Sequence, residues 1–188
     1  MAPLLAILLL QILLMIAVAA FVVFIFYALI VGFRNGAPFV RSRRAKRNTM
    51  LAIANIKQGD VVMDLGSGDG TLLLEVARLG GRTVGVEINP FLVFYSRMRN
   101  RLLGLARDIT IQRGNLRDFG LGEADIVFLY LLTTTNASLR EKFERELKPT
   151  ARVITNDFPV TGWTPAEVRD GVYLYYPPKK KWDMGHEL

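Results

Sequence analysis

A glycine-rich run with an acid one strand later has the residue types needed to hold a nucleoside. Residues 64–70 read Asp-Leu-Gly-Ser-Gly-Asp-Gly and directly follow the apolar residues 61–63. Glycines at alternate positions let the backbone turn sharply and approach a ligand closely, because no Cβ stands in the way. Glu87 ends the next apolar run, residues 83–86, where its carboxylate can accept hydrogen bonds from both ribose hydroxyls. Strand, loop, helix, strand and acid in this order predict a nucleoside site.

The charges and spacing of the loop favour a cationic ligand. Asp64 and Asp69 place two carboxylates at the loop, where they repel a pyrophosphate and suit a sulfonium and an ammonium group. The spacing is GxGxG, whereas dinucleotide folds prefer GxGxxG. We therefore expect S-adenosylmethionine rather than a nicotinamide cofactor. The expected cofactor-binding residues are Asp64, Gly66, Ser67, Gly68, Asp69, Gly70, Glu87, Ile88, Asn89, Asn115 and Leu116.

The segments around this loop alternate between strand and helix, which predicts an α/β fold with a Rossmann-like, doubly wound and mostly parallel sheet. In such a sheet the ligand lies beyond the carboxyl ends of the strands, so the loops after the first four strands should meet there. Asn115, in the third loop, either accepts a hydrogen bond from the adenine amino group or only holds a turn. We expect strands at 61–65, 83–87, 109–112, 125–131, 151–156 and 171–176, the last antiparallel, and helices at 44–56, 71–79, 89–103 and 137–147.

The N-terminal segment is apolar over residues 4–33 and carries no charged side chain. This length is enough to cross a bilayer as a helix. The alternative is a cleavable signal peptide, because residues 17–19 (Ala-Val-Ala) look like a cleavage site, but no Lys or Arg precedes the apolar run, which continues past that site. We expect a single-pass transmembrane anchor over 1–34, a basic juxtamembrane segment over 35–48 and the catalytic domain over 49–188.

The positive charge of the chain is concentrated just after the apolar segment. Six of its 24 Lys and Arg lie there, and the remaining 18 nearly balance 17 Asp and Glu, so the net charge of +7 is a local property. This pattern predicts contacts of residues 41–47 with anionic lipid headgroups, a cytoplasmic or matrix-side domain, and no nucleic-acid partner. The six cations are Arg34, Arg41, Arg43, Arg44, Lys46 and Arg47.

The chain lacks cysteine, and His186 is its one histidine. The absence of cysteine excludes disulfides, thiolate zinc sites and a cysteine nucleophile. A single histidine close to the end of the chain cannot form a histidine-based metal site by itself, so we expect no metal.

Several further motifs support a resemblance that covers about three quarters of the chain. Residues 36–176 resemble the small membrane-anchored protein-lysine methyltransferases that include the ATP synthase c-subunit and adenine nucleotide translocase lysine methyltransferases. Departures from that family are Asn115-Leu116-Arg117 in place of Asp-Leu-Trp, Arg41 in place of a proline, and Asn156-Asp157 in place of Cys-Arg. The matching motifs are Pro38-Phe39-Val40, the loop 64–70, the run 85–97, Phe158-Pro159 and Trp163-Thr164-Pro165.

The resemblance implies methylation of a lysine ε-amine on a membrane protein. Lysine is mostly protonated at neutral pH, so such a site removes the charge by desolvation or passes the proton to a carboxylate or water. Asp157, at the end of the fifth expected strand, is our candidate group near the amine, although it could equally cap a turn. Tyr95, Phe158 and Trp163 are candidate aromatic walls for the lysine stem, although such residues more often serve packing than a site.

Two other functions remain open at this point. An active site anchored at the headgroup level would also meet lipids and quinones, so a lipid or quinone methyltransferase is one alternative. A non-catalytic, membrane-anchored module that binds S-adenosylmethionine is the other. Methylation of nucleobases is disfavoured, because residues 156–159 (Asn-Asp-Phe-Pro) resemble the motif of those enzymes only superficially and follow the fifth expected strand, not the fourth.

Overall fold

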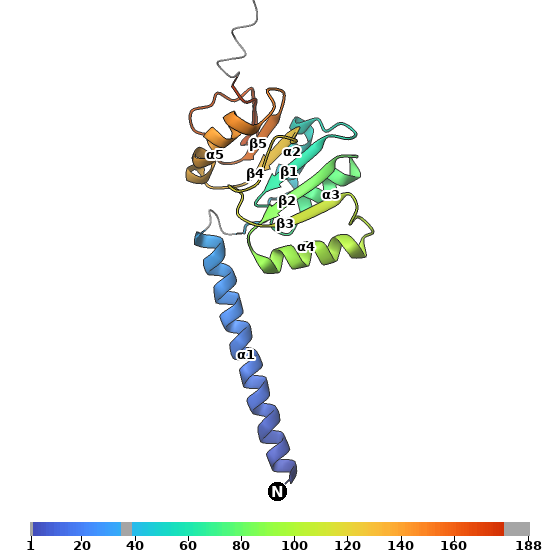
Figure 1. Ribbon diagram of the computed structural model, residues 1–188, viewed down its shortest axis with the longest axis vertical. Helices are drawn as coiled ribbons and strands as arrows, with labels where there is room; N and C mark the ends of the chain where they lie inside the picture. The colour runs from blue at the N-terminus through green and yellow to red at the C-terminus, as the bar shows by residue number, and fades with distance from the viewer. Residues whose placement is uncertain (1, 35–38, 179–188) are drawn as a thin grey trace, which may run out of the picture.

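The computed structural model describes residues 2–34 and 39–178, and it confirms the expected α/β fold (Figure 1). Residues 35–38 of the expected basic segment, which include Pro38, lie outside the described residues, and so does His186. The first helix, α1 (Ala2–Arg34), projects from a domain built on one twisted sheet with helices against it.

Among the described residues, the sheet has seven strands in the order β3-β2-β1-β4-β5-β7-β6. The five strands β1 to β5 are parallel, and β7 runs antiparallel to β5, as the sequence predicted. The short edge strand β6, antiparallel to β7, was not predicted. The winding reverses at β1, which pairs with β2 on one side and β4 on the other. The strands are β1 (Val61–Leu65), β2 (Arg82–Glu87), β3 (Ile109–Arg113), β4 (Ile126–Leu129), β5 (Arg152–Asn156), β6 (Glu167–Arg169) and β7 (Val172–Tyr175).

Side chains alternate along the strands and give the sheet a core on each face. Val62 packs with Met50 of the helix before β1, whereas Leu65 packs with Phe143 on the opposite face. Three helices thus cover one face and the fourth covers the other. They are α2 (Arg44–Ala54), α3 (Thr71–Arg78) and α4 (Pro90–Leu102) on the first face and α5 (Thr133–Glu146) on the second.

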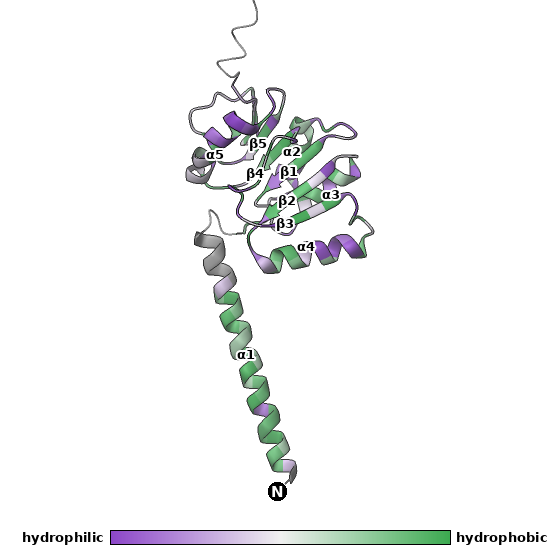
Figure 2. Cartoon of the chain, in the orientation of Figure 1, coloured by the Kyte–Doolittle hydropathy of each residue, from purple (hydrophilic) through white to green (hydrophobic). Residues whose placement is uncertain are grey.

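The helix α1 is apolar along almost all of its coloured length (Figure 2). Within it, Pro3–Tyr27 is long and apolar enough to cross a membrane by length and composition, and the domain buries none of this stretch. The ring centroids of Phe24 in α1 and Phe91 in α4 are 6.2 Å apart in an edge-to-face arrangement, so α1 contacts the first turn of α4.

Candidate functional site

The loop between β1 and α3 has a shape that requires glycine. Gly66 and Gly68 have φ angles of +85° and +56°, in the left-handed region. A Cβ on Gly68 would also overlap the ring of Phe39, which rests on the loop. Because these glycines have no side chains, the ring of Phe39 approaches the loop backbone closely, and a ligand could do the same.

Glu87 holds the loop in place from the end of β2. Its carboxylate accepts hydrogen bonds from the backbone N–H of Gly68 at 2.9 Å and of Asn89 at 2.8 Å. Burial raises the pKa of Glu87 and outweighs the backbone hydrogen bonds from Asn89, Gly68 and Ile88, which lower it. A carboxylate offers about four acceptor positions, so about one remains for a ligand beside these three bonds.

A cavity of about 520 Å³ lies above this loop, at the carboxyl ends of the central strands. Its volume is in the range of small-molecule and cofactor sites. Ten of the eleven expected cofactor-binding residues line it, and the exception is Gly70, which caps α3. The ten are Asp64, Gly66, Ser67, Gly68, Asp69, Glu87, Ile88, Asn89, Asn115 and Leu116.

The cavity contains polar groups that suit a cationic, hydroxyl-bearing ligand. Burial, together with the charges of Glu87 and Asp69, raises the pKa of Asp64 to about 7. A cation placed beside Asp64 would favour its charged form. The Oγ atom of Ser67 is buried and has no hydrogen-bond partner among the described residues. Buried polar groups are normally satisfied, so these residues fit a bound S-adenosylmethionine.

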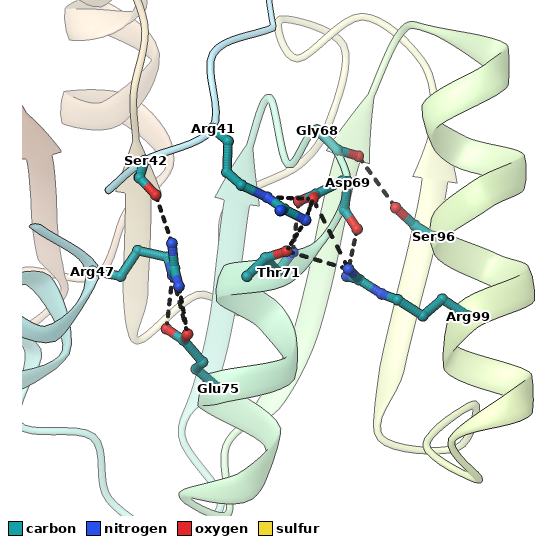
Figure 3. Close-up of polar contacts among 9 residues, drawn as sticks. All are labelled: Arg41, Ser42, Arg47, Gly68, Asp69, Thr71, Glu75, Ser96 and Arg99. Atoms are coloured by element: carbon teal, nitrogen blue, oxygen red, sulfur yellow. Dashed lines mark hydrogen bonds and ion pairs between the residues drawn. The ribbon is translucent and has the colours of Figure 1, made fainter. Parts of the chain in front are cut away.

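Asp69 differs from its expected role, because a cation of the same chain already pairs with it (Figure 3). Its carboxylate accepts hydrogen bonds from Arg41 Nε at 2.8 Å and from the backbone N–H of Thr71 at 3.0 Å, while Arg99 donates to its carbonyl at 2.5 Å. Burial raises the pKa of Asp69, but the hydrogen bonds from Thr71 and Arg41 prevail and hold it below its ordinary value. Asp64 and Glu87 are thus the cavity carboxylates best placed for the cofactor.

The segment before α2 forms one wall of the cavity. Residues 39–43, which we call the strap, contribute Phe39, Val40, Arg41 and Ser42 to the lining. The guanidinium of Arg47 donates to the Ser42 carbonyl at 2.5 Å and to the Glu75 carboxylate at 3.0 Å, which fastens the strap to α3 (Figure 3). Sequence reasoning left the strap out of the site; the Phe39-Val40 match was the one signal for it.

Three of the cations expected to face lipid headgroups form ion pairs within the domain, and their contact with lipid stays a prediction. Arg41 pairs with Asp69, Arg47 pairs with Glu75, and the Lys46 ammonium lies 2.5 Å from the Asp157 carboxylate. Their first role in this structure is to fix the strap and α2 against the sheet.

Asn115 holds the turn, which is one of its two expected roles, and its role toward adenine stays a prediction. Its Oδ1 accepts a hydrogen bond from the backbone N–H of Arg117 at 3.0 Å, which holds the turn after β3, and the residue also lines the cavity.

The four residues expected near the substrate are not brought together, and none lines the cavity. Trp163 packs in the core, where the centroid of its ring lies 6.1 Å from that of Phe143 and 6.0 Å from that of Tyr175. Its indole N–H donates a hydrogen bond to the Glu144 carboxylate. The Tyr95 ring lies 5.5 Å from the Arg99 guanidinium on the outer side of α4.

Phe158 lies closer to the cavity than Tyr95 and Trp163 do, and Asp157 is its neighbour in the chain. The Phe158 ring is 6.0 Å from the ring of Tyr130, which does line the cavity. The Asn136 amide donates to the Phe158 carbonyl at 2.8 Å and so holds the loop after β5 against α5. Asp157, with φ +59°, bonds Lys46 as described above.

The fold and this cavity define a class I S-adenosylmethionine-dependent methyltransferase. The structure is similar to the crystal structure of an RNA methyltransferase from Salinibacter ruber in complex with S-adenosyl-L-homocysteine, with a TM-score of 0.72 and 34% identity. That match covers 75% of this chain and 95% of the other. A methyltransferase from Geobacter sulfurreducens, also with S-adenosyl-L-homocysteine, shares the fold with a TM-score of 0.54.

Within that class, the chain belongs to the ANTKMT methyltransferase domain family, which matches residues 64–167. It is 37% identical over 153 residues to the protein-lysine N-methyltransferase of Saccharolobus islandicus, covering 73% of this chain and 92% of the relative. It is 33% identical over 142 residues to the human lysine N-methyltransferase of the ATP synthase c-subunit, and this match covers 73% of this chain and 60% of the human protein.

Proposed function

We propose that this protein is a membrane-anchored methyltransferase that acts on a lysine side chain of a membrane protein. The observation that carries the proposal is the position of the cavity beside α1. Phe91 lines the cavity and also contacts Phe24 of the long apolar helix. If α1 spans a bilayer, the methyl donor is held close to the membrane surface, where a lysine flanking a transmembrane segment would be found.

The chemistry requires a neutral amine in line with the methyl group. The bound cofactor supplies a methyl group on a positively charged sulfur. The chain must align the amine at about 3 Å and accept its proton, because lysine has an ordinary pKa near 10.4. The paired rings of Tyr130 and Phe158 are suited to hold the alkyl stem at the cavity mouth. Asp157, which already binds the ammonium of Lys46, remains our candidate for the group near the amine.

Transfer of label to membranes tests this function. Membranes from cells that lack this protein would be incubated with methyl-labelled S-adenosylmethionine and the purified full chain, and labelled bands would be mapped by peptide analysis. We expect label on a lysine of a membrane protein, and none with the Glu87→Ala variant. Label in the organic extract would support a lipid or quinone substrate instead, and label in RNA would match the name of the Salinibacter ruber relative. If no label were transferred, the result would favour a non-catalytic module that binds S-adenosylmethionine.

A further inference from the structure

The helix α4 exposes an apolar face that the described residues of its own domain leave uncovered. Its opposite face is buried on the sheet through Leu92, Val93, Ser96 and Asn100. The exposed residues recur at the 3-4 spacing of one helix face, and the exposed fraction reaches 61% for Phe94 and 82% for Leu102. We call this face the apolar stripe; it consists of Phe91, Phe94, Tyr95, Met98 and Leu102.

The charges of α4 are of one sign. The helix contains Arg97, Arg99 and Arg101 and no Asp or Glu. Arg97 donates to the Ile111 carbonyl and Arg99 is bonded to the glycine loop, whereas Arg101 is exposed beside the stripe. Figure 2 shows that, along its length, the N-terminal half of α4, nearer α1, is mostly apolar and the C-terminal half, which contains the arginines, is mostly hydrophilic. An apolar stripe with arginine beside it is typical of helices that lie in the interface of an anionic membrane.

The position of α4 along α1 points to the same partner. Phe24 of α1 contacts Phe91 at the first turn of α4, and Figure 1 shows α4 running crosswise to α1. From Pro3 to Phe24 an α-helix rises about 32 Å, and the hydrocarbon core of a bilayer is about 30 Å thick. If α1 enters the bilayer at Pro3, it leaves the hydrocarbon at the level of the apolar stripe.

We infer that α4 is an interfacial helix that lays the apolar stripe on an anionic bilayer. This inference rests on the membrane anchoring proposed above and extends it. With α1 as its one attachment to the membrane, the domain could rotate relative to the bilayer. A second contact through α4 fixes the orientation of the domain. Because Asn89, Phe91 and Leu92 at the start of α4 also line the cavity, docking of α4 places the cavity mouth at the headgroups. The orientation then selects lysines close to the membrane surface.

The absence of native cysteine makes the test direct. Single Phe94→Cys and Leu102→Cys variants of the full chain carry a nitroxide label in nanodiscs of phosphatidylcholine and phosphatidylglycerol. Relaxation is measured with oxygen, which concentrates in the bilayer, and with a water-soluble nickel chelate. We expect both labels to respond to oxygen and to be shielded from nickel. A label at Glu141→Cys, exposed on α5, should respond to nickel.

The outcomes separate this inference from the anchoring on which it rests. A Leu13→Cys label in α1 that responds only to oxygen, together with a nickel-accessible Leu102→Cys label, overturns docking of α4 and leaves the anchor standing. A nickel-accessible Leu13→Cys label overturns the anchor itself. Dipolar broadening between Phe94→Cys labels of two copies shows that a second chain covers the apolar stripe and overturns the bilayer as its partner.

A matched pair of variants tests the consequence for activity. Leu102 and Leu103 are adjacent exposed leucines, but only Leu102 belongs to the apolar stripe. We expect Leu102→Glu to lose methylation of membrane substrate while its dissociation constant for S-adenosylmethionine is unchanged. Leu103→Glu should keep both. Equal loss in the two variants, or none in Leu102→Glu, overturns the role of the stripe.

Discussion

The carboxylate of Glu87 accepts hydrogen bonds from the backbone N–H groups of Gly68, in the loop after β1, and of Asn89, which follows β2. The sequence motif predicts a ribose-binding acid at this position, and the structure adds a second task, because the same side chain fixes the loop that a nucleoside would contact. At the residue scale, the site therefore depends on carboxylates that shape the cavity as well as line it.

Replacement of Glu87 by glutamine should weaken the cofactor complex. The amide keeps the size of the side chain but has one acceptor oxygen, so an N–H of Gly68 or Asn89 would face another donor. Hydrogen bonds to charged groups contribute about 1.5–3 kcal/mol, so we expect the dissociation constant for S-adenosylmethionine to rise about 10- to 100-fold in titration calorimetry. Asp118→Asn, at an exposed position, is the control. If Glu87→Gln bound S-adenosylmethionine with unchanged affinity, the Glu87 carboxylate would have no role in cofactor binding.

The buried acid Asp64 should make stability depend on pH. Its pKa is raised to about 7 in the folded protein, from an ordinary value of 3.8, so the folded state holds this proton between about pH 4 and 7 while the unfolded chain releases it. The free energy of unfolding therefore falls as pH rises through this window, by on the order of 4 kcal/mol from this group. Denaturant titrations of Asp64→Asn should show a flatter profile over the window. Parallel profiles would contradict the raised pKa.

The proposed role of Asp157 can be separated from its ion pair with Lys46. Asparagine tolerates the positive φ of this residue but cannot accept a proton, so Asp157→Asn should lower kcat by about 100-fold or more with unchanged cofactor affinity. Lys46→Met removes the ion pair and keeps the carboxylate, and we expect near-normal turnover. If both variants lose activity equally, Asp157 serves the architecture of α2 rather than the reaction.

At the scale of elements, the strap joins the apolar helix to the catalytic site. Phe39 rests on Gly68 and Arg41 pairs with Asp69, so the chain leading from α1 also closes one side of the cavity. The Arg41 side chain is 58% exposed, and solvent screening limits such a pair to about 1 kcal/mol or less. A contact of this strength holds the strap closed without locking it.

Release of the strap should speed departure of the cofactor. We expect Arg41→Gln to raise the dissociation rate constant of S-adenosylhomocysteine, measured by stopped flow, by at most about fivefold, in line with an exposed ion pair. The control is Arg44→Gln, which removes a positive charge from an exposed position at the start of α2. An equal effect in both variants would point to general charge rather than to the contact with Asp69.

The elements that the sequence predicts well are those with strong local signals. The five parallel strands carry apolar runs, and α4 has Pro90 in its first turn with Asn89 as its cap, accepting from Phe91. The start of α5 was misplaced at residue 137, because threonines 133–135 have low helix propensity. Burial of Thr135 and Asn136 outweighs that propensity. The strand β6 has three residues and a mostly exposed pattern, which no local signal marks.

At the scale of the whole molecule, the predictable part of the site is the part that is local in sequence. The glycine loop and Glu87 belong to one strand-helix-strand unit, and their motif identifies them. The pairing of Arg41 with Asp69 and the core position of Trp163 depend on how distant segments pack, which composition and spacing do not encode. The same holds for the contact between Phe24 and Phe91, on which the orientation of the domain at a membrane depends.

Because the cavity lies where strap, loop and three strands meet, a bound cofactor should stabilise the whole domain. A ligand at 100 times its dissociation constant adds about 2.7 kcal/mol to the free energy of unfolding, which corresponds to a rise in Tm of about 5–10 °C for a domain of this size. In a Trp182→Phe variant, the fluorescence of Trp163, in the domain core, reports this transition in detergent without a contribution from α1. S-adenosylhomocysteine should produce the shift and a nicotinamide dinucleotide should not, since the carboxylates of Asp64 and Glu87 line the cavity and disfavour a pyrophosphate. A shift with the dinucleotide alone would overturn the assignment of the cofactor.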